Sequence, residues 1–172
     1  RLMLEKELYD TVEVFLRARL RCFTARQNTG LKAGRIDVVG LRDVGGDLAG
    51  TGEVVGIEVK RGAQPFLLAV GQAAAYSVYA DRCYLADIRR TGFTELEKTI
   101  AVRLGVGLIA LRPNGRPAIR EEMTAPVVQP LPHLRLELIE KLHYSLCTWC
   151  TGVLARGAEG NFRAKVVPQR EN

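Results

Sequence analysis

Apolar residues recur at helical spacing near the start of the chain. Within residues 3–20 they occupy every third or fourth position, at Leu4, Leu8, Val12, Phe15, Leu16 and Leu20. This period predicts an amphipathic helix that packs one face on the body of the protein. Glu5 precedes Leu8 by three residues, so its carboxylate should lie at the edge of the apolar stripe. Because an unpaired carboxylate is costly there, Glu5 is expected to have a partner.

Three runs with the pattern of strands follow this helix. Residues 21–28, 35–42 and 53–60 are rich in apolar and β-branched positions, and in the last run Val55, Ile57 and Val59 alternate with the rest. The intervening segments are rich in glycine and polar residues, which favours a turn over residues 29–34 and a loose loop over residues 43–52. Short connections between consecutive strands predict an antiparallel meander.

The rest of the chain alternates between helical and strand patterns. The expected elements are a helix opened by Pro65 over 65–80, a strand over 82–88, a helix over 92–104, a strand over 106–112, a turn at Asn114-Gly115 with residues 116–121 pairing back, and a helix over 133–149. This order predicts an α/β fold in which helices flank both faces of a mixed sheet. We place a first domain at residues 1–122 and assign residues 123–172 to a proline-containing linker, a C-terminal helix and a tail.

Composition narrows the class of protein. The chain has 172 residues, of which 47% are hydrophobic and 26% are charged, as in ordinary globular domains. No apolar stretch approaches the roughly 20 residues that cross a bilayer, and the first residues lack the apolar core of a signal peptide. We therefore expect a cytoplasmic protein without a membrane partner. The net charge of +6 favours a polyanion such as nucleic acid, although a basic protein with no such partner is the alternative.

The four cysteines are too scattered to predict a disulfide framework. Cys22 and Cys83 lie in apolar strand-like runs, so both are expected to be buried thiols. Cys147 and Cys150 form a single C-x-x-C, and a zinc or iron–sulfur site would need four ligands within reach. We therefore interpret this pair as packed thiols near a helix end, and we assign no role to the two histidines.

Charged residues interrupt two of the predicted strands. Asp37 lies on the second strand, while Glu58 and Lys60 lie two residues apart on the third and so share a face. The hairpin between these strands can bring Asp37 beside Glu58. A divalent cation would compensate the two carboxylates, and Mg²⁺ prefers such oxygen ligands. The alternative is an exposed strand face with a surface ion pair, which contributes little to stability.

The residues around these positions resemble a known family. The matching segments are Gly34-Arg35-Ile36-Asp37-Val38-Val39, Gly56-Ile57-Glu58-Val59-Lys60 and a following helix with Gln72-Ala73-Ala74-Ala75-Tyr76. They resemble the PD-(D/E)xK nuclease superfamily, whose restriction-endonuclease-like fold has an α-β-β-β-α-β core. The last segment is similar to the Gln-x-x-x-Tyr element of RecB-type and phage-exonuclease-type members. Ile36 stands where the family has proline, and the resemblance covers roughly residues 3–112.

The resemblance implies a role for each matching residue. Asp37 and Glu58 would ligate Mg²⁺, for which Mn²⁺ can substitute, with help from the backbone carbonyl of Val59. Lys60 would be the catalytic lysine, and Gln72 and Tyr76 would orient the site or contact the phosphate. The family's acidic first helix corresponds to Glu5-Lys6-Glu7-Leu8-Tyr9, of which Glu5 is the favoured further ligand; Glu7 and Glu13 are alternatives.

These observations predict a metal-dependent nuclease that hydrolyses DNA phosphodiester bonds. The alternative is a catalytically inactive nucleic-acid-binding or assembly module on the same fold. Lys32 and Arg35 flank the turn before Asp37, where they could contact a phosphate backbone or simply be solvated. The apolar face of the last helix, within residues 124–150, could support a homodimer.

Overall fold

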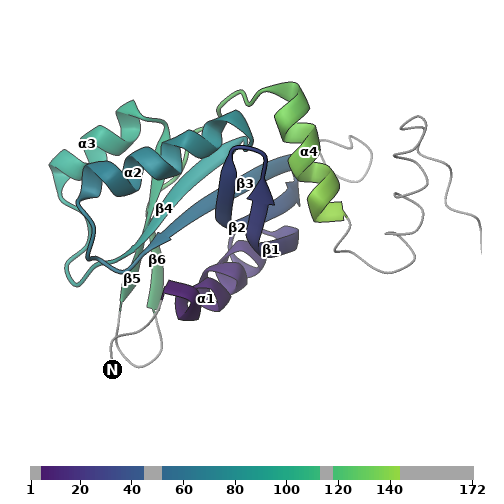
Figure 1. Ribbon diagram of the computed structural model, residues 1–172. Coiled ribbons are helices and arrows are strands. Elements are labelled where there is room, and N and C mark those ends of the chain that lie inside the picture. The colour runs from purple at the N-terminus through teal and green to yellow at the C-terminus, as the bar shows by residue number, and fades with distance from the viewer. Residues whose placement is uncertain (1–4, 45–51, 113–117, 144–172) are drawn as a thin grey trace, which may run out of the picture.

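The computed structural model describes residues 5–44, 52–112 and 118–143. Within these residues the chain forms a mixed α/β structure with one six-stranded open sheet and four α-helices (Figure 1). The elements are α1 (Glu5–Ala18), β1 (Cys22–Leu31), β2 (Gly34–Asp43), β3 (Gly52–Lys60), α2 (Phe66–Ala75), the 3₁₀ turn η1 (Tyr76–Val78), β4 (Arg82–Ile88), α3 (Glu95–Arg103), β5 (Val106–Arg112), β6 (Ala118–Met123) and α4 (Pro132–His143).

The strands lie in the sheet in the order in which they occur in the sequence. β1, β2 and β3 form the expected antiparallel meander, and β6 pairs with β5 in antiparallel fashion. β3, β4 and β5 are parallel, because α2 and α3 each carry the chain back across the sheet. The predicted mixed sheet is therefore confirmed.

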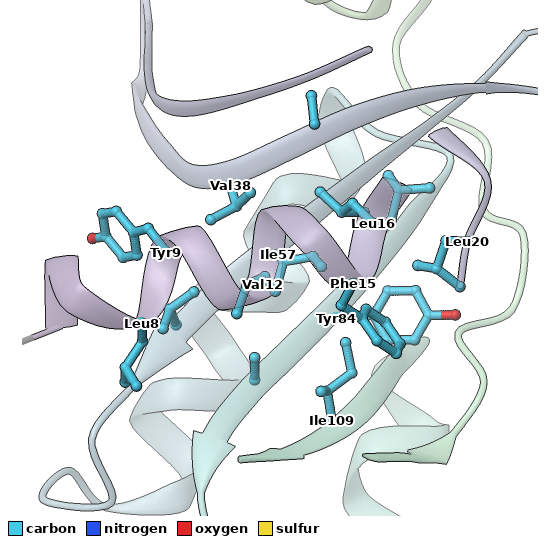
Figure 2. Close-up of a cluster of buried hydrophobic side chains, with 14 of the residues drawn as sticks. Leu8, Tyr9, Val12, Phe15, Leu16, Leu20, Val38, Ile57, Tyr84 and Ile109 are labelled. Atoms are coloured by element: carbon cyan, nitrogen blue, oxygen red, sulfur yellow. The ribbon is translucent and has the colours of Figure 1, made fainter. Parts of the chain in front are cut away.

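One face of the sheet is covered by α1 (Figure 1). Figure 2 shows the apolar stripe of this helix lying on the strands, with Val12 and Phe15 among the side chains that meet Val38, Ile57 and Ile109. These side chains are almost fully buried, so their contacts fix the position of α1 on the sheet. The helical period of the first apolar residues correctly predicted this packing.

The opposite face is covered by α2, α3 and α4 (Figure 1). Val70 and Ala73 of α2 pack with Leu85 and Leu108 of the sheet in one cluster. Leu138 of α4 belongs to a second cluster, which includes strand residues of β2 and β3. The apolar face of α4 is thus used within the chain, although it was the motive for expecting a homodimer.

The bounds of several elements differ from the sequence prediction. The turn predicted over residues 29–34 is wrong for most of that range, because β1 extends to Leu31 and β2 begins at Gly34. The helix predicted to reach residue 80 ends at Ala75, after which the chain tightens into η1. α3 begins at Glu95 rather than at residue 92, since the side chain of Thr94 caps the helix.

Several sequence predictions fall outside the described residues. They concern the Asn114-Gly115 turn, the last part of the helix over 133–149, Cys147 with Cys150, and the tail. Cys22 and Cys83 are buried free thiols, as predicted. Among the described helices, none combines the length and the apolar composition that a membrane span requires.

Candidate active site

Strand pairing brings Asp37 beside Glu58. Val38 of β2 pairs with Ile57 of β3 in antiparallel register. The next position along the ladder therefore places Asp37 of β2 opposite Glu58 of β3. The Oδ2 atom of Asp37 accepts a hydrogen bond of 2.9 Å from the backbone N–H of Val59 on β3. The juxtaposition expected from the hairpin is therefore present.

The second oxygen of Asp37 is bound by a residue that the sequence analysis did not select. The hydroxyl of Tyr9 on α1 donates a hydrogen bond of 2.9 Å to Asp37 Oδ1. Tyr9 is buried, and this burial together with the hydrogen bond to Asp37 raises its pKa well above the ordinary range. A signal for Tyr9 existed, since it follows Glu5 by one helical turn, but its contact with Asp37 spans 28 residues of sequence.

Glu58 lies at the bottom of the site with only 5% of its surface exposed. Its Oε1 lies 2.6 Å from Lys60 Nζ, and its Oε2 accepts a hydrogen bond from the hydroxyl of Tyr76. Burial raises the pKa of Glu58, and repulsion from Asp37 acts in the same direction, against the opposing contacts with Lys60 and Tyr76. Two carboxylates and one lysine carry a local charge of −1 when all three are ionised.

Lys60 is also buried, and its ammonium group is held by Glu58. Burial alone would lower the pKa of Lys60, but the contact with Glu58 outweighs this effect and the net pKa is raised. The charges of Glu5 and Asp37 act in the same direction as Glu58. Lys60 therefore stays protonated at neutral pH, so it can donate hydrogen bonds and stabilise negative charge but cannot accept a proton.

Tyr76 and Gln72 approach the carboxylates from the other side of the sheet. Tyr76 begins η1, directly after α2, and its hydroxyl lies 3.0 Å from the backbone carbonyl oxygen of Arg35 as well as next to Glu58. One hydroxyl proton thus faces two acceptors. Gln72 is exposed and lines the same pocket as Tyr76, as expected from their spacing.

A pocket of about 570 Å³ opens over these residues. Asp37, Glu58, Gln72 and Tyr76 form its polar side, and Arg35 lies at its border with the β1–β2 hairpin. The candidate residues from three elements therefore reach one space. Lys32 is exposed at the tip of the hairpin.

The acidic residues of α1 differ in their relation to the site. Glu5 is half-buried, and its negative charge contributes to raising the pKa of both Tyr9 and Lys60. Glu13 points elsewhere, since its carboxylate accepts hydrogen bonds from Gln27 and Arg17. Of the glutamates of α1, Glu5 is thus the one whose charge acts on residues of the site. Glu7 is exposed.

The donor set of the site suits a small hard cation. Within the described ranges no three side chains of His, Cys, Asp or Glu are grouped to hold a metal ion. Asp37 and Glu58 nevertheless supply two adjacent carboxylates whose four oxygens each accept one contact, which leaves a second lone pair on each oxygen. Mg²⁺ is commonly held by one or two carboxylates together with waters, so these residues fit it.

Other buried carboxylates of the sheet are neutralised by arginine. Glu53 on β3 is bound by Arg42 and Arg82, and Asp87 on β4 is bound by Arg89. Asp37 and Glu58 differ because they lie side by side, and the lysine beside them, Lys60, contacts Glu58. No family model matches the sequence, and no curated protein matches it either.

Proposed function

We propose that the protein is a metal-dependent nuclease of the PD-(D/E)xK type with a restriction-endonuclease-like fold. The observation that carries this proposal is the placement of Asp37 beside Glu58 in one pocket, with Lys60 in contact with Glu58. The described element order, α1-β1-β2-β3-α2-β4, is that of the family's core. A paired carboxylate site with a net negative charge supports a cation in this position.

In this proposal the residues of the site have different roles in phosphodiester hydrolysis. Asp37 and Glu58 would hold Mg²⁺, which supplies an activated water and stabilises the leaving oxygen when it is bound. Once a cation neutralises Glu58, the ammonium group of Lys60 is free to hold a water or a phosphate oxygen. As an ammonium group, Lys60 would donate hydrogen bonds and place a positive charge beside the negative charge that develops in the transition state.

A nucleic acid is the substrate class that the charge supports. The chain carries a net charge of +6, which would attract a phosphate backbone. Because the carboxylate pair itself is negative, this attraction would come from basic residues around the pocket. Arg35 at the border of the pocket and Lys32 at the hairpin tip are positioned for such contacts. DNA is the substrate we propose.

A non-catalytic nucleic-acid-binding module is the second candidate. It is favoured by one observation: Lys60 and Tyr76 each contact one oxygen of Glu58, so groups of the protein compensate this carboxylate. In this reading the Glu58–Lys60 pair stabilises the end of β3, and DNA would bind to the basic surface alone. Such a module would bind DNA equally well with metal and with EDTA.

The two candidates are separated by a cleavage assay. We expect wild-type protein to cut at least one member of a panel of labelled linear, nicked, branched and single-stranded DNA in Mg²⁺ or Mn²⁺, and none in EDTA. Asp37→Ala and Lys60→Ala should each lower the rate by at least about 100-fold, because the first removes a proposed metal ligand and the second removes the positive charge beside the reacting phosphate. Binding without cutting of any form, at equal affinity in metal and EDTA, would favour the binding module.

A further inference from the structure

The contact between α1 and the carboxylate of Asp37 has a consequence for the metal site. Asp37 lies on β2, but its two oxygens are held by groups from two other elements: Tyr9 on α1 and the backbone of Val59 on β3. An O–H and an N–H donor on different oxygens fix the plane of the carboxylate as well as its position. Three elements therefore determine the direction in which the remaining lone pairs point.

The hydroxyl of Tyr9 is well placed for this task. Tyr9 is 7% exposed, and its ring belongs to the cluster that packs α1 on the sheet. Leu8 and Val12, its neighbours on the helix, are buried in the same cluster, so the ring has little freedom to move. Figure 2 shows Tyr9 at one end of this cluster, with its hydroxyl directed beyond the apolar side chains.

We propose that Tyr9 is a positioning residue that orients Asp37 for metal binding, a role that rests on the proposed function. Tyr9 acts through Asp37 and contacts neither metal nor phosphate. A phenylalanine would fill the same apolar space, so the hydroxyl contributes through its hydrogen bond to Asp37. Groups that orient a metal ligand from outside typically change metal affinity or activity by about 10–100-fold when they are removed.

A second buried tyrosine provides a matched control. Tyr84 belongs to the same apolar cluster and donates a hydrogen bond of 2.8 Å from its hydroxyl to the carboxylate of Glu121. Figure 2 places Tyr84 at the opposite end of the labelled cluster from Tyr9. Tyr84→Phe therefore removes the same kind of bond from the same core without touching Asp37.

The test compares Mg²⁺ and Mn²⁺ binding by wild-type protein, Tyr9→Phe and Tyr84→Phe. Isothermal titration calorimetry gives the Kd without substrate, and cleavage rates at increasing metal concentration give the half-saturating concentration. We expect Tyr9→Phe to raise both quantities by about 10–100-fold while it keeps most of the rate at saturating metal. Tyr84→Phe should leave both quantities at the wild-type value, whatever thermal stability the two variants lose.

Two outcomes would overturn the inference in different ways. If wild-type protein binds and uses metal, and Tyr9→Phe has the same Kd and half-saturating concentration, Tyr9 has only a structural role. If both tyrosine variants weaken metal binding equally, the effect comes from the core and not from Asp37. Failure of wild-type protein to bind metal would instead contradict the proposed function, from which the role of Tyr9 follows.

Discussion

Glu53 and Glu58 are buried carboxylates on one strand, but they have different surroundings. Glu53 is bound by two arginines, and Glu58 shares its surroundings with Asp37 and a single lysine. Burial alone would raise the pKa of Glu53, but the hydrogen bonds from Arg82 and Arg42 outweigh it and lower the pKa. Glu58 has its pKa raised instead, mainly by burial. Glu53 is thus compensated by two arginines, whereas Glu58 and Asp37 together carry more negative charge than the single lysine compensates.

This difference predicts how Glu53 affects stability as a function of pH. A carboxyl group with a pKa lower in the folded state than its ordinary value of 4.5 stabilises the fold above that value. The contribution is lost as the pH falls through the lowered pKa. Glu53→Gln should therefore decrease the free energy of unfolding by about 1–3 kcal/mol at neutral pH, because it removes charged hydrogen bonds.

Urea unfolding near pH 7 and near pH 3 checks this expectation. The loss caused by Glu53→Gln should be smaller near pH 3, because below the ordinary value of 4.5 the unfolded state takes up the proton and the advantage of the charged group shrinks. An equal loss at both pH values would mean that the side chain stabilises the strand by packing and not by its charge.

The β1–β2 hairpin is longer than the residue pattern predicted. Thr29-Gly30 has the composition of a turn, yet Thr29 pairs with Ile36 and Gly30 pairs with Arg35 in the ladder. Asn28 takes a positive φ of 49° just before these pairs, which an asparagine accommodates more readily than most residues. Arg35, which lies in this hairpin, also lines the pocket. The turn wrongly predicted over residues 29–34 therefore lies next to the candidate site.

Two glycines in regular elements should respond oppositely to substitution by alanine. Gly71 lies in α2 with open space around the position of a Cβ atom, so Gly71→Ala should increase the free energy of unfolding by about 0.5–1 kcal/mol. Gly107 lies in β5, where a Cβ atom would lie 2.5 Å from the backbone nitrogen of Ala125 and against the ring of Tyr84. Gly107→Ala should therefore destabilise the protein by about 2 kcal/mol or more.

Chemical denaturation of both glycine variants tests the packing of these elements. A neutral effect of Gly107→Ala would mean that the segment around Ala125 does not lie against β5 as the structure has it. A loss of stability in Gly71→Ala would argue against an exposed helical position for this residue.

Periodicity predicted most elements because the burial of α1 and of the strands follows local patterns. The meander of the first three strands and the placement of Asp37 beside Glu58 followed from short connections, which leave few alternatives. The hydrogen bond from Tyr9 to Asp37 and the packing of α4 on the sheet could not be predicted in this way. Both join residues far apart in the sequence, and their geometry depends on how whole elements pack.

At the scale of the molecule, the candidate site lies where both layers of helices reach the sheet. α1 contributes Tyr9 and the charge of Glu5 from one face, while α2 and η1 contribute Gln72 and Tyr76 from the other. The meander supplies Asp37, Glu58 and Lys60 at the ends of two adjacent strands. The fold therefore brings Asp37 and Glu58 into one pocket, with Lys60 in contact with Glu58, and we propose that this site cleaves DNA with a bound metal.

The most direct measurement is DNA cleavage in Mg²⁺ by Glu58→Gln compared with Glu53→Gln and wild-type protein. Both substitutions remove a buried, ion-paired carboxylate from β3, so they differ mainly in whether the carboxylate belongs to the pocket. At a temperature where all three proteins are folded, we predict that Glu58→Gln loses cleavage by at least about 100-fold while Glu53→Gln keeps it. Cleavage that survives Glu58→Gln, or that is lost equally in both variants, would contradict the account.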